Sequence, residues 1–217
     1  MISIFSAVIT GIITFAATKV DDLFILVFFF SQTDAAFRRR HIVAGQYLGF
    51  AALVAISLLG FWGSFIVPVA WIGLLGFLPI GIGIHKFLRR NENVKVAQAD
   101  RLDEKSEKLS LFSGLFSRQT LTVANVTFAN GGDNIGIYTP LFANSNFFRL
   151  GIFLFIFFLL VSVWCYAGFI LSRYLLVAKV FSRYGRLIVP FVLAGLGFYI
   201  LMESGAAALM AGWIRSF

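Results

Sequence analysis

Six long runs of apolar residues, separated by shorter polar segments, constrain this sequence more than any other feature. They cover residues 2–30, 42–64, 66–88, 119–142, 150–172 and 187–212. A helix that crosses the hydrocarbon core of a bilayer needs about 20 mostly apolar residues, and each run has roughly that length. Only 13% of the 217 residues are charged, which is about half the share usual in a soluble domain. We therefore predict an all-α polytopic membrane protein with six transmembrane helices.

The six runs predict a single membrane domain that covers residues 1–217. Residues 89–118 are polar and mix both signs of charge, which predicts a loop between two groups of three helices, at 1–88 and 119–217. The first run is too long for the apolar core of a signal peptide, and no basic segment precedes it. We expect this run to remain in the mature protein.

The basic residues predict how the helices are oriented. They gather in the odd-numbered connections, namely Arg38, Arg39 and Arg40 in the first, seven residues from Arg89 to Arg118 in the third, and Arg173, Lys179, Arg183 and Arg186 around the fifth. The second and fourth connections hold only Arg149. Basic loops stay in the cytoplasm, so we expect both termini on the outer side. The net charge of +8 then reflects topology, and we expect no nucleic-acid partner.

An internal repeat relates the two groups of helices. Residues 18–22 (TKVDD) correspond to residues 130–134 (NGGDN) at a constant offset of 112 positions, and the alanine before each motif keeps the same offset. Because each group has three helices, the two groups would have opposite orientations. Inverted repeats are typical of secondary transporters, whose substrate site lies where the repeats meet. We therefore predict two inverted three-helix repeats with a site between the motifs.

The polar residues of the two motifs predict a cation site. A charge at the centre of a membrane helix costs about 2.5–3.5 kcal/mol, so the four charged motif residues cost on the order of 10 kcal/mol unless they are paired or bind an ion. In each motif a polar residue is followed three and four positions later by acidic or amide residues, so one helix face carries all of these oxygens. Such ligands suit Mg²⁺, Mn²⁺ or Ca²⁺. The expected metal ligands are Thr18, Asp21, Asp22, Asn130, Asp133 and Asn134.

Several neighbouring residues have roles that the sequence leaves open. Gly131 and Gly132 weaken the fourth helix and would free backbone carbonyls as further ligands. Lys19 would either neutralise part of the acidic charge or extend towards an interface. Gln46 lies in a small-xxx-small pattern, which favours a helix contact over a ligand. For Glu203 the alternatives are a proton-handling acid and an interface residue, whereas His85 and Lys86 are expected at a helix end facing water.

Three segments carry a resemblance to a known family. They are residues 18–24 (TKVDDLF), residues 45–50 (GQYLGF) and, most specifically, residues 130–138 (NGGDNIGIY) with residues 140–142 (PLF). Together they resemble the CadD family of cadmium resistance transporters, which belongs to the lysine exporter superfamily. The resemblance covers essentially the whole chain and implies a multi-pass exporter of divalent cations in the plasma (inner) membrane. It implies a metal-handling role for Asp21, Asp22, Asn130, Asp133 and Asn134, while Lys19 stands where a small or polar residue is expected.

Export of a divalent cation against an inside-negative potential must be coupled to another gradient, and no nucleotide-binding motif occurs in the sequence. We therefore predict proton antiport, with the bilayer, the cation and protons as partners and the metal as substrate rather than cofactor. A homodimer is one option for the assembly. The alternatives are an amino-acid exporter of the same superfamily, a non-transporting membrane subunit and an intramembrane aspartyl protease. Of these classes a transporter, not an enzyme, is expected.

Overall fold

The described part of the chain is entirely helical. The computed structural model describes residues 2–35, 37–66, 71, 74–88, 117–204 and 206, with the backbone alone at 2–3 and 175–187. No strand occurs among these residues, so the predicted all-α class is confirmed for them. The elements are α1 (Ile2–Ser31), α2 (Arg39–Gly63), the short 3-10 helix η1 (Leu74–Gly76), α4 (Phe77–Leu88), α6 (Arg118–Asn130), α7 (Gly132–Ala143), α8 (Phe147–Leu171) and α9 (Leu175–Glu203).

Nearly all of the described residues in each predicted apolar run are helical. The fourth run, predicted as one helix, is divided at Gly131 into α6 and α7. The sixth helix begins at Leu175, well before the predicted residue 187. The sequence interpretation assigned the intervening lysine and arginines to a connection, although both residue types are good helix formers. Residues 89–116 of the predicted loop, residues 67–70 and 72–73 of the third run and residues 205 and 207–212 of the sixth lie outside the described residues.

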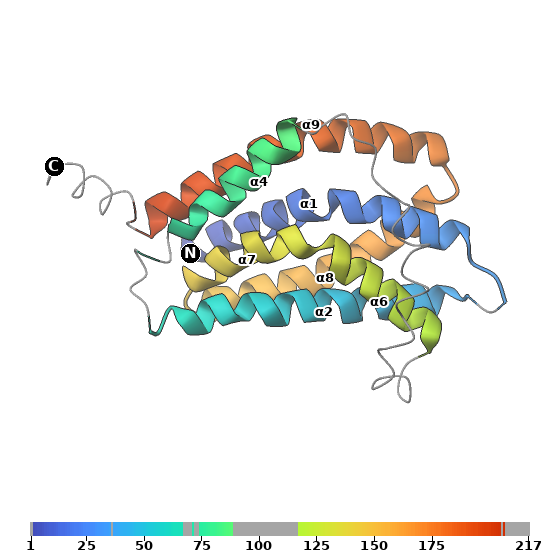
Figure 1. The fold of residues 1–217 in the computed structure, drawn as a ribbon, viewed down its shortest axis with the longest axis horizontal. Coiled ribbons are helices and arrows are strands. Elements are labelled where there is room, and N and C mark those ends of the chain that lie inside the picture. The colour runs from blue at the N-terminus through green and yellow to red at the C-terminus, as the bar shows by residue number, and fades with distance from the viewer. Residues whose placement is uncertain are drawn as a thin grey trace, which may run out of the picture.

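The helices run lengthwise through an elongated bundle (Figure 1). Helix α2 packs along α6 and α7, α1 packs along α8 and α9, and α4 packs along α9. The α1–α2 connection, the start of α6 and the α8–α9 connection lie at one end of the bundle, which we call the basic end (Figure 1). The exposed arginines there include Arg38, Arg39, Arg40, Arg118 and Arg173. The start of α1 and the α7–α8 connection lie at the opposite end, in agreement with the predicted alternation.

The surface of the bundle is suited to lipid. Among the described residues, α2 and α8 are long and apolar enough to cross a membrane, and Leu74–Leu88 and Ile188–Glu203 form shorter apolar helices. Large apolar side chains are exposed on several helices, for example Leu59 (68%), Phe155 (71%) and Phe198 (60%). Extensive exposed apolar surface is typical of membrane contact. The apolar helices therefore agree with a helical membrane protein, while six spans and their inverted symmetry remain predictions.

Two glycines allow α2 to lie directly against α6. A Cβ atom at Gly45 would lie 2.6 Å from the carbonyl oxygen of Thr120, and one at Gly49 would lie 2.5 Å from that of Ala124. Between them, Thr127 Oγ1 donates a hydrogen bond to Gln46 Oε1 (2.8 Å). Gln46 therefore makes the helix contact that the small-xxx-small pattern favours.

The close approach at Gly49 predicts a loss of stability on substitution. In Gly49→Ala the new methyl group would overlap the α6 backbone and force the helices apart, which we expect to cost about 1–3 kcal/mol. Thermal unfolding of the purified protein in detergent measures this loss. Gly151→Ala in α8 is the matched control, because nothing lies within 4 Å of a Cβ atom there. Equal melting temperatures for the two variants would contradict the described α2–α6 contact.

Candidate functional site

A buried ion pair lies in the middle of α1. The Lys19 ammonium donates to Asp22 Oδ2, one helical turn away, and both residues are almost fully buried. The same ammonium lies 4.9 Å from the centroid of the Phe50 ring, a distance at which a cation is attracted to the ring face. Trp164 Nε1 of α8 donates to the Lys19 carbonyl oxygen (2.8 Å). Lys19 is thus held inside the bundle and does not extend towards an interface.

The break between α6 and α7 brings the second motif against this pair. Gly131 follows the last residue of α6, and a Cβ atom there would lie only 2.2 Å from Leu53 Cδ1 of α2, so a larger residue would require the Leu53 side chain to shift. Asn130, the last residue of α6, donates its side-chain amide to Asp22 Oδ1. The predicted weakening of the helix is thus confirmed as a break. The Gly131 carbonyl, however, accepts a hydrogen bond from the Asn134 N–H (3.0 Å), so the break does not leave it without a partner.

Further contacts join the two motifs around the buried pair. Oriented with its oxygen towards Lys19, the buried Asn134 amide accepts from Lys19 Nζ (3.3 Å) and donates to Asp133 Oδ1 (3.3 Å). Thr18 Oγ1 shares a hydrogen bond with Tyr138 Oη (2.6 Å) and donates to the carbonyl oxygens of Thr14 and Phe15. Thr18 therefore faces Tyr138 rather than a carboxylate. Its hydroxyl is part of the contact between α1 and α7.

Lys86 forms a second, more accessible layer of the site. Its ammonium lies 2.7 Å from Asp21 Oδ2 and 2.8 Å from Asp133 Oδ2, and so bridges α1 and α7 from the last turn of α4. The three side chains are 23%, 30% and 28% exposed, respectively. The prediction that Lys86 faces water at a helix end is therefore wrong. The helix does end there, but packing places that end beside the acidic motifs.

Tyr138 and Lys86 are the site residues that sequence reasoning missed. Tyr138 is fully buried against an aromatic cluster, with the Phe157 and Phe50 ring centroids 4.8 Å and 6.2 Å away, and its hydroxyl points to Thr18. It stands inside the distinctive NGGDNIGIY segment, which is the one signal that would have indicated it. For Lys86, the signal in the sequence was a positive charge near the end of the third apolar run.

The two lysines offset two of the three negative charges of the site. Each of the three motif carboxylates contacts a lysine ammonium, Asp22 through Lys19 and the other two through Lys86. This pairing offsets the cost of placing four charges in the first and fourth apolar runs. Across the described part of the chain, no group of three or more His, Cys, Asp or Glu side chains is arranged to hold a metal ion. Five of the six predicted ligands, all except Thr18, are therefore brought into one network, with lysines between its carboxylates.

Glu203 belongs to a separate pair. Arg149, near the start of α8, donates to Glu203 Oε1 of α9, and its other terminal nitrogen donates to Tyr199 Oη (3.0 Å). The start of α8 lies at the end of the bundle opposite the basic end (Figure 1). Glu203 thus makes an interhelical contact there, and its role as a proton-handling acid or an interface residue stays a prediction.

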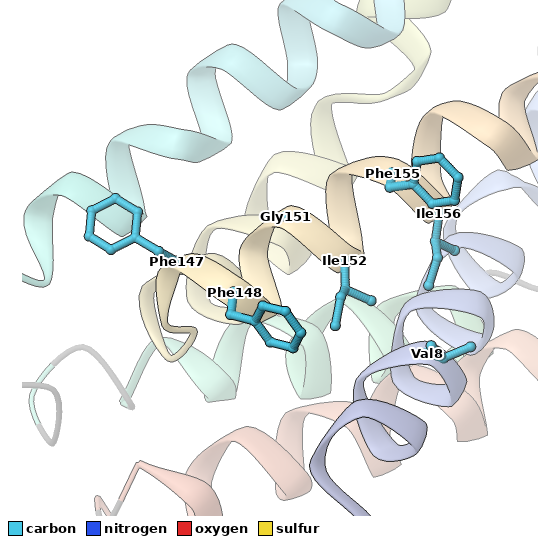
Figure 2. A pocket seen from close by; sticks show the side chains of 7 residues that line it. All are labelled: Val8, Phe147, Phe148, Gly151, Ile152, Phe155 and Ile156. Atoms are coloured by element: carbon cyan, nitrogen blue, oxygen red, sulfur yellow. The ribbon is translucent and has the colours of Figure 1, made fainter. Parts of the chain in front are cut away.

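A groove between α1 and α8 offers no ligand for an ion. Its volume is about 590 Å³, and it is lined by Val8, Phe147, Phe148, Gly151, Ile152, Phe155 and Ile156 (Figure 2). All of these residues are apolar, so a cation would lose its hydration there without gaining a partner. The network of the two motifs remains the candidate site.

A family model described as cadmium resistance transporter matches residues 15–212, a range that includes both motifs and Lys86. Neither the curated proteins nor the solved structures gave a match.

Proposed function

This chain belongs to the cadmium resistance transporter family, and from that membership we propose that it exports divalent metal cations through the network of the two motifs. Membership itself indicates a membrane transporter of metal ions. The observation that carries the finer proposal is the direct contact between the motifs, through Asn130 and Asp22 and through the Lys86 bridge from Asp21 to Asp133. Residues far apart in the sequence thus meet at one oxygen-rich position.

The position of the network along α1 supports a site near the membrane midplane. Asp21 lies ten residues before Ser31, the end of α1, which corresponds to about 15 Å of helix. Half of a typical hydrocarbon core is also about 15 Å. A cation bound here would be about equally far from both membrane surfaces.

Helix packing supports the proposed inverted repeat. In such a repeat α1 corresponds to α6 with α7, α2 corresponds to α8, and α4 corresponds to α9. The observed packing of α1 on α8 is then equivalent to that of α2 on α6 and α7, and the α4–α9 pair maps onto itself. The two acidic motifs occupy corresponding positions, as the offset in the sequence requires.

The chemistry of the site favours hard divalent ions. Its groups are carboxylates, amides and hydroxyls, which suit Mn²⁺, Ca²⁺ and Mg²⁺ better than a soft ion. The one cysteine, Cys165, is buried in α8 next to Trp164, which donates to the Lys19 carbonyl oxygen. We propose that cadmium is carried by a site built for harder ions, without help from this thiol. Cys165→Ala should then leave the affinities for manganese and cadmium unchanged in equilibrium binding measurements.

We propose proton antiport as the coupling. Moving two charges out against 100 mV costs about 4.6 kcal/mol before any concentration gradient is counted. Protons that bind the carboxylates from outside would release the metal, and metal that binds from inside would displace the protons. The partly exposed Asp21 and Asp133 are the carboxylates most accessible for this exchange.

Metal binding by the purified protein tests the proposed site. We expect saturable binding within a panel of Mn²⁺, Ca²⁺, Mg²⁺, Zn²⁺ and Cd²⁺, and a rise in Kd of at least about tenfold in Asp21→Asn and Asp133→Asn, because each loses a charged ligand. Glu203→Gln is the matched control, since it removes an ion-paired carboxylate outside the network. If all three variants bind as the parent does, the proposed site is wrong.

One observation favours a second candidate. The Asp21 and Asp133 carboxylates hold an alkylammonium group, that of Lys86, so they would also accept the side chain of a basic amino acid. An amino-acid exporter would bind free lysine at this position. Competition of lysine against Mn²⁺ distinguishes the two, because a metal exporter should bind Mn²⁺ equally well with and without millimolar lysine.

A further inference from the structure

Lys86 occupies the position where the proposed site would hold a cation. Its ammonium contacts one carboxylate from each motif, at 2.7 Å and 2.8 Å. We propose that Lys86 is a tethered counterion, which takes the place of the exported ion between Asp21 and Asp133 and is displaced when that ion binds. This inference rests on the proposed function, and it assigns Lys86 a role in setting the affinity for metal.

The charges of the network favour displacement over joint occupancy. The buried Lys19–Asp22 pair is neutral, so Asp21, Asp133 and Lys86 together carry a formal charge of −1. A divalent ion added to these three would leave +1, whereas a divalent ion in place of Lys86 leaves zero. A low-dielectric environment penalises net charge. The ion and the Lys86 ammonium should therefore exclude each other.

Of the two lysines, only Lys86 is placed to leave the site. Lys19 is 0% exposed and is held by Asp22 and Asn134 under the Phe50 ring. Lys86 lies on the last turn of α4, its side chain is 23% exposed, and its neighbour His85 is exposed. A lysine has a flexible stem of four carbons, so rotation of its side chain can move the ammonium away from the two carboxylates. Displacement then needs no movement of the helices.

Removal of the tethered cation should tighten metal binding. If Lys86 occupies the site most of the time, the apparent Kd is raised by the inverse of the free fraction. We expect Lys86→Gln to lower the Kd for Mn²⁺ about tenfold or more, and Lys86→Arg to stay near the parent value. The matched control is Arg149→Gln, which removes an ion-paired cation outside the network and should leave the Kd unchanged. An unchanged or raised Kd in folded Lys86→Gln would overturn the inference.

Chemical rescue separates the charge from the fold. Lys86→Cys, treated with 2-bromoethylamine, regains an ammonium on a stem of nearly the same length. We expect the untreated variant to bind Mn²⁺ more tightly than the parent and the treated variant to return to the parent Kd. The parent treated in the same way is the control, because its own Cys165 is buried. Equal affinities before and after treatment would contradict the tethered counterion.

The unsubstituted protein gives an independent readout. Amine acylation followed by mass spectrometry should label Lys86 faster in saturating Mn²⁺ than without metal, while the buried Lys19 stays unlabelled in both. Slower or equal labelling of Lys86 would overturn the inference.

Two variants together separate this inference from the proposed function. If Asp133→Asn loses Mn²⁺ binding but Lys86→Gln binds as the parent does, the tethered counterion is refuted and the proposed site stands. Parent-like binding in Asp133→Asn refutes the proposed site itself.

Discussion

Asp22→Asn is expected to destabilise the protein by about 3–5 kcal/mol, because it leaves the Lys19 ammonium buried without a counterion. Lys19 is fully buried, and Asp22 is the only carboxylate among the described residues that pairs with it. An asparagine side chain keeps the shape of the aspartate but loses its charge. The variant should also lose divalent binding, since the network around the second motif depends on the same carboxylate.

Thermal unfolding in detergent measures the first effect, which we expect to lower the Tm by on the order of 10 °C. Glu203→Gln serves as control, because its carboxylate pairs with Arg149 where both side chains are partly exposed, and the expected loss is small. A melting temperature of Asp22→Asn equal to that of the parent would show that the Lys19–Asp22 pair is not buried as described.

The double variant Lys19→Met with Asp22→Asn separates folding from binding. Removal of both charges of a buried pair is often neutral for stability, whereas removal of one partner is costly. We therefore expect the double variant to recover most of the lost Tm and yet to bind divalent ions less tightly than the parent, because the carboxylate that Asn130 contacts is gone. Recovery of binding together with stability would mean that Asp22 acts only as the partner of Lys19.

The sequence was sufficient to predict the helices and the meeting of the two motifs. Apolar runs of membrane length are nearly independent of tertiary context, and helices formed at all six where the structure describes them. The offset between residues 18–22 and 130–134 indicated that the motifs would meet, and the contact of Asn130 with Asp22 agrees with this. The adjacent glycines similarly indicated the break between α6 and α7.

The partner of each charge could not be predicted. Asp21 and Asp22 are adjacent in sequence, yet one contacts Lys86 of α4 and the other contacts Lys19 of α1. Side chains of successive residues point about 100° apart on a helix, so their partners depend on which helices pack on either side. Lys86 was missed for the same reason. A lysine at the end of an apolar run is usually at the membrane surface, and only the packing of α4 reveals the acids beside it.

A proton gradient should drive the distribution of metal across a membrane that contains the protein. In proteoliposomes with the voltage clamped, each proton exchanged per ion should change the equilibrium ratio of Mn²⁺ about tenfold per unit of pH difference, because one pH unit corresponds to 1.36 kcal/mol per proton. One proton per ion predicts about tenfold, and two predict about 100-fold. Metal should accumulate on the more acidic side.

Vesicles with Asp133→Asn are the control for this experiment, because they keep the lipid, the leak and the fold but lack one of the two partly exposed carboxylates. An equal Mn²⁺ ratio with and without the gradient in the parent would refute antiport while leaving the binding site intact.

The size of the response to the pH gradient also tests the role of Lys86. With that ammonium in place, Asp21, Asp133 and Lys86 together carry a charge of −1. One bound proton brings this sum to zero, and one divalent ion in place of the ammonium also gives zero. A tenfold response per pH unit would then match an exchange in which Lys86 and one proton together replace the metal.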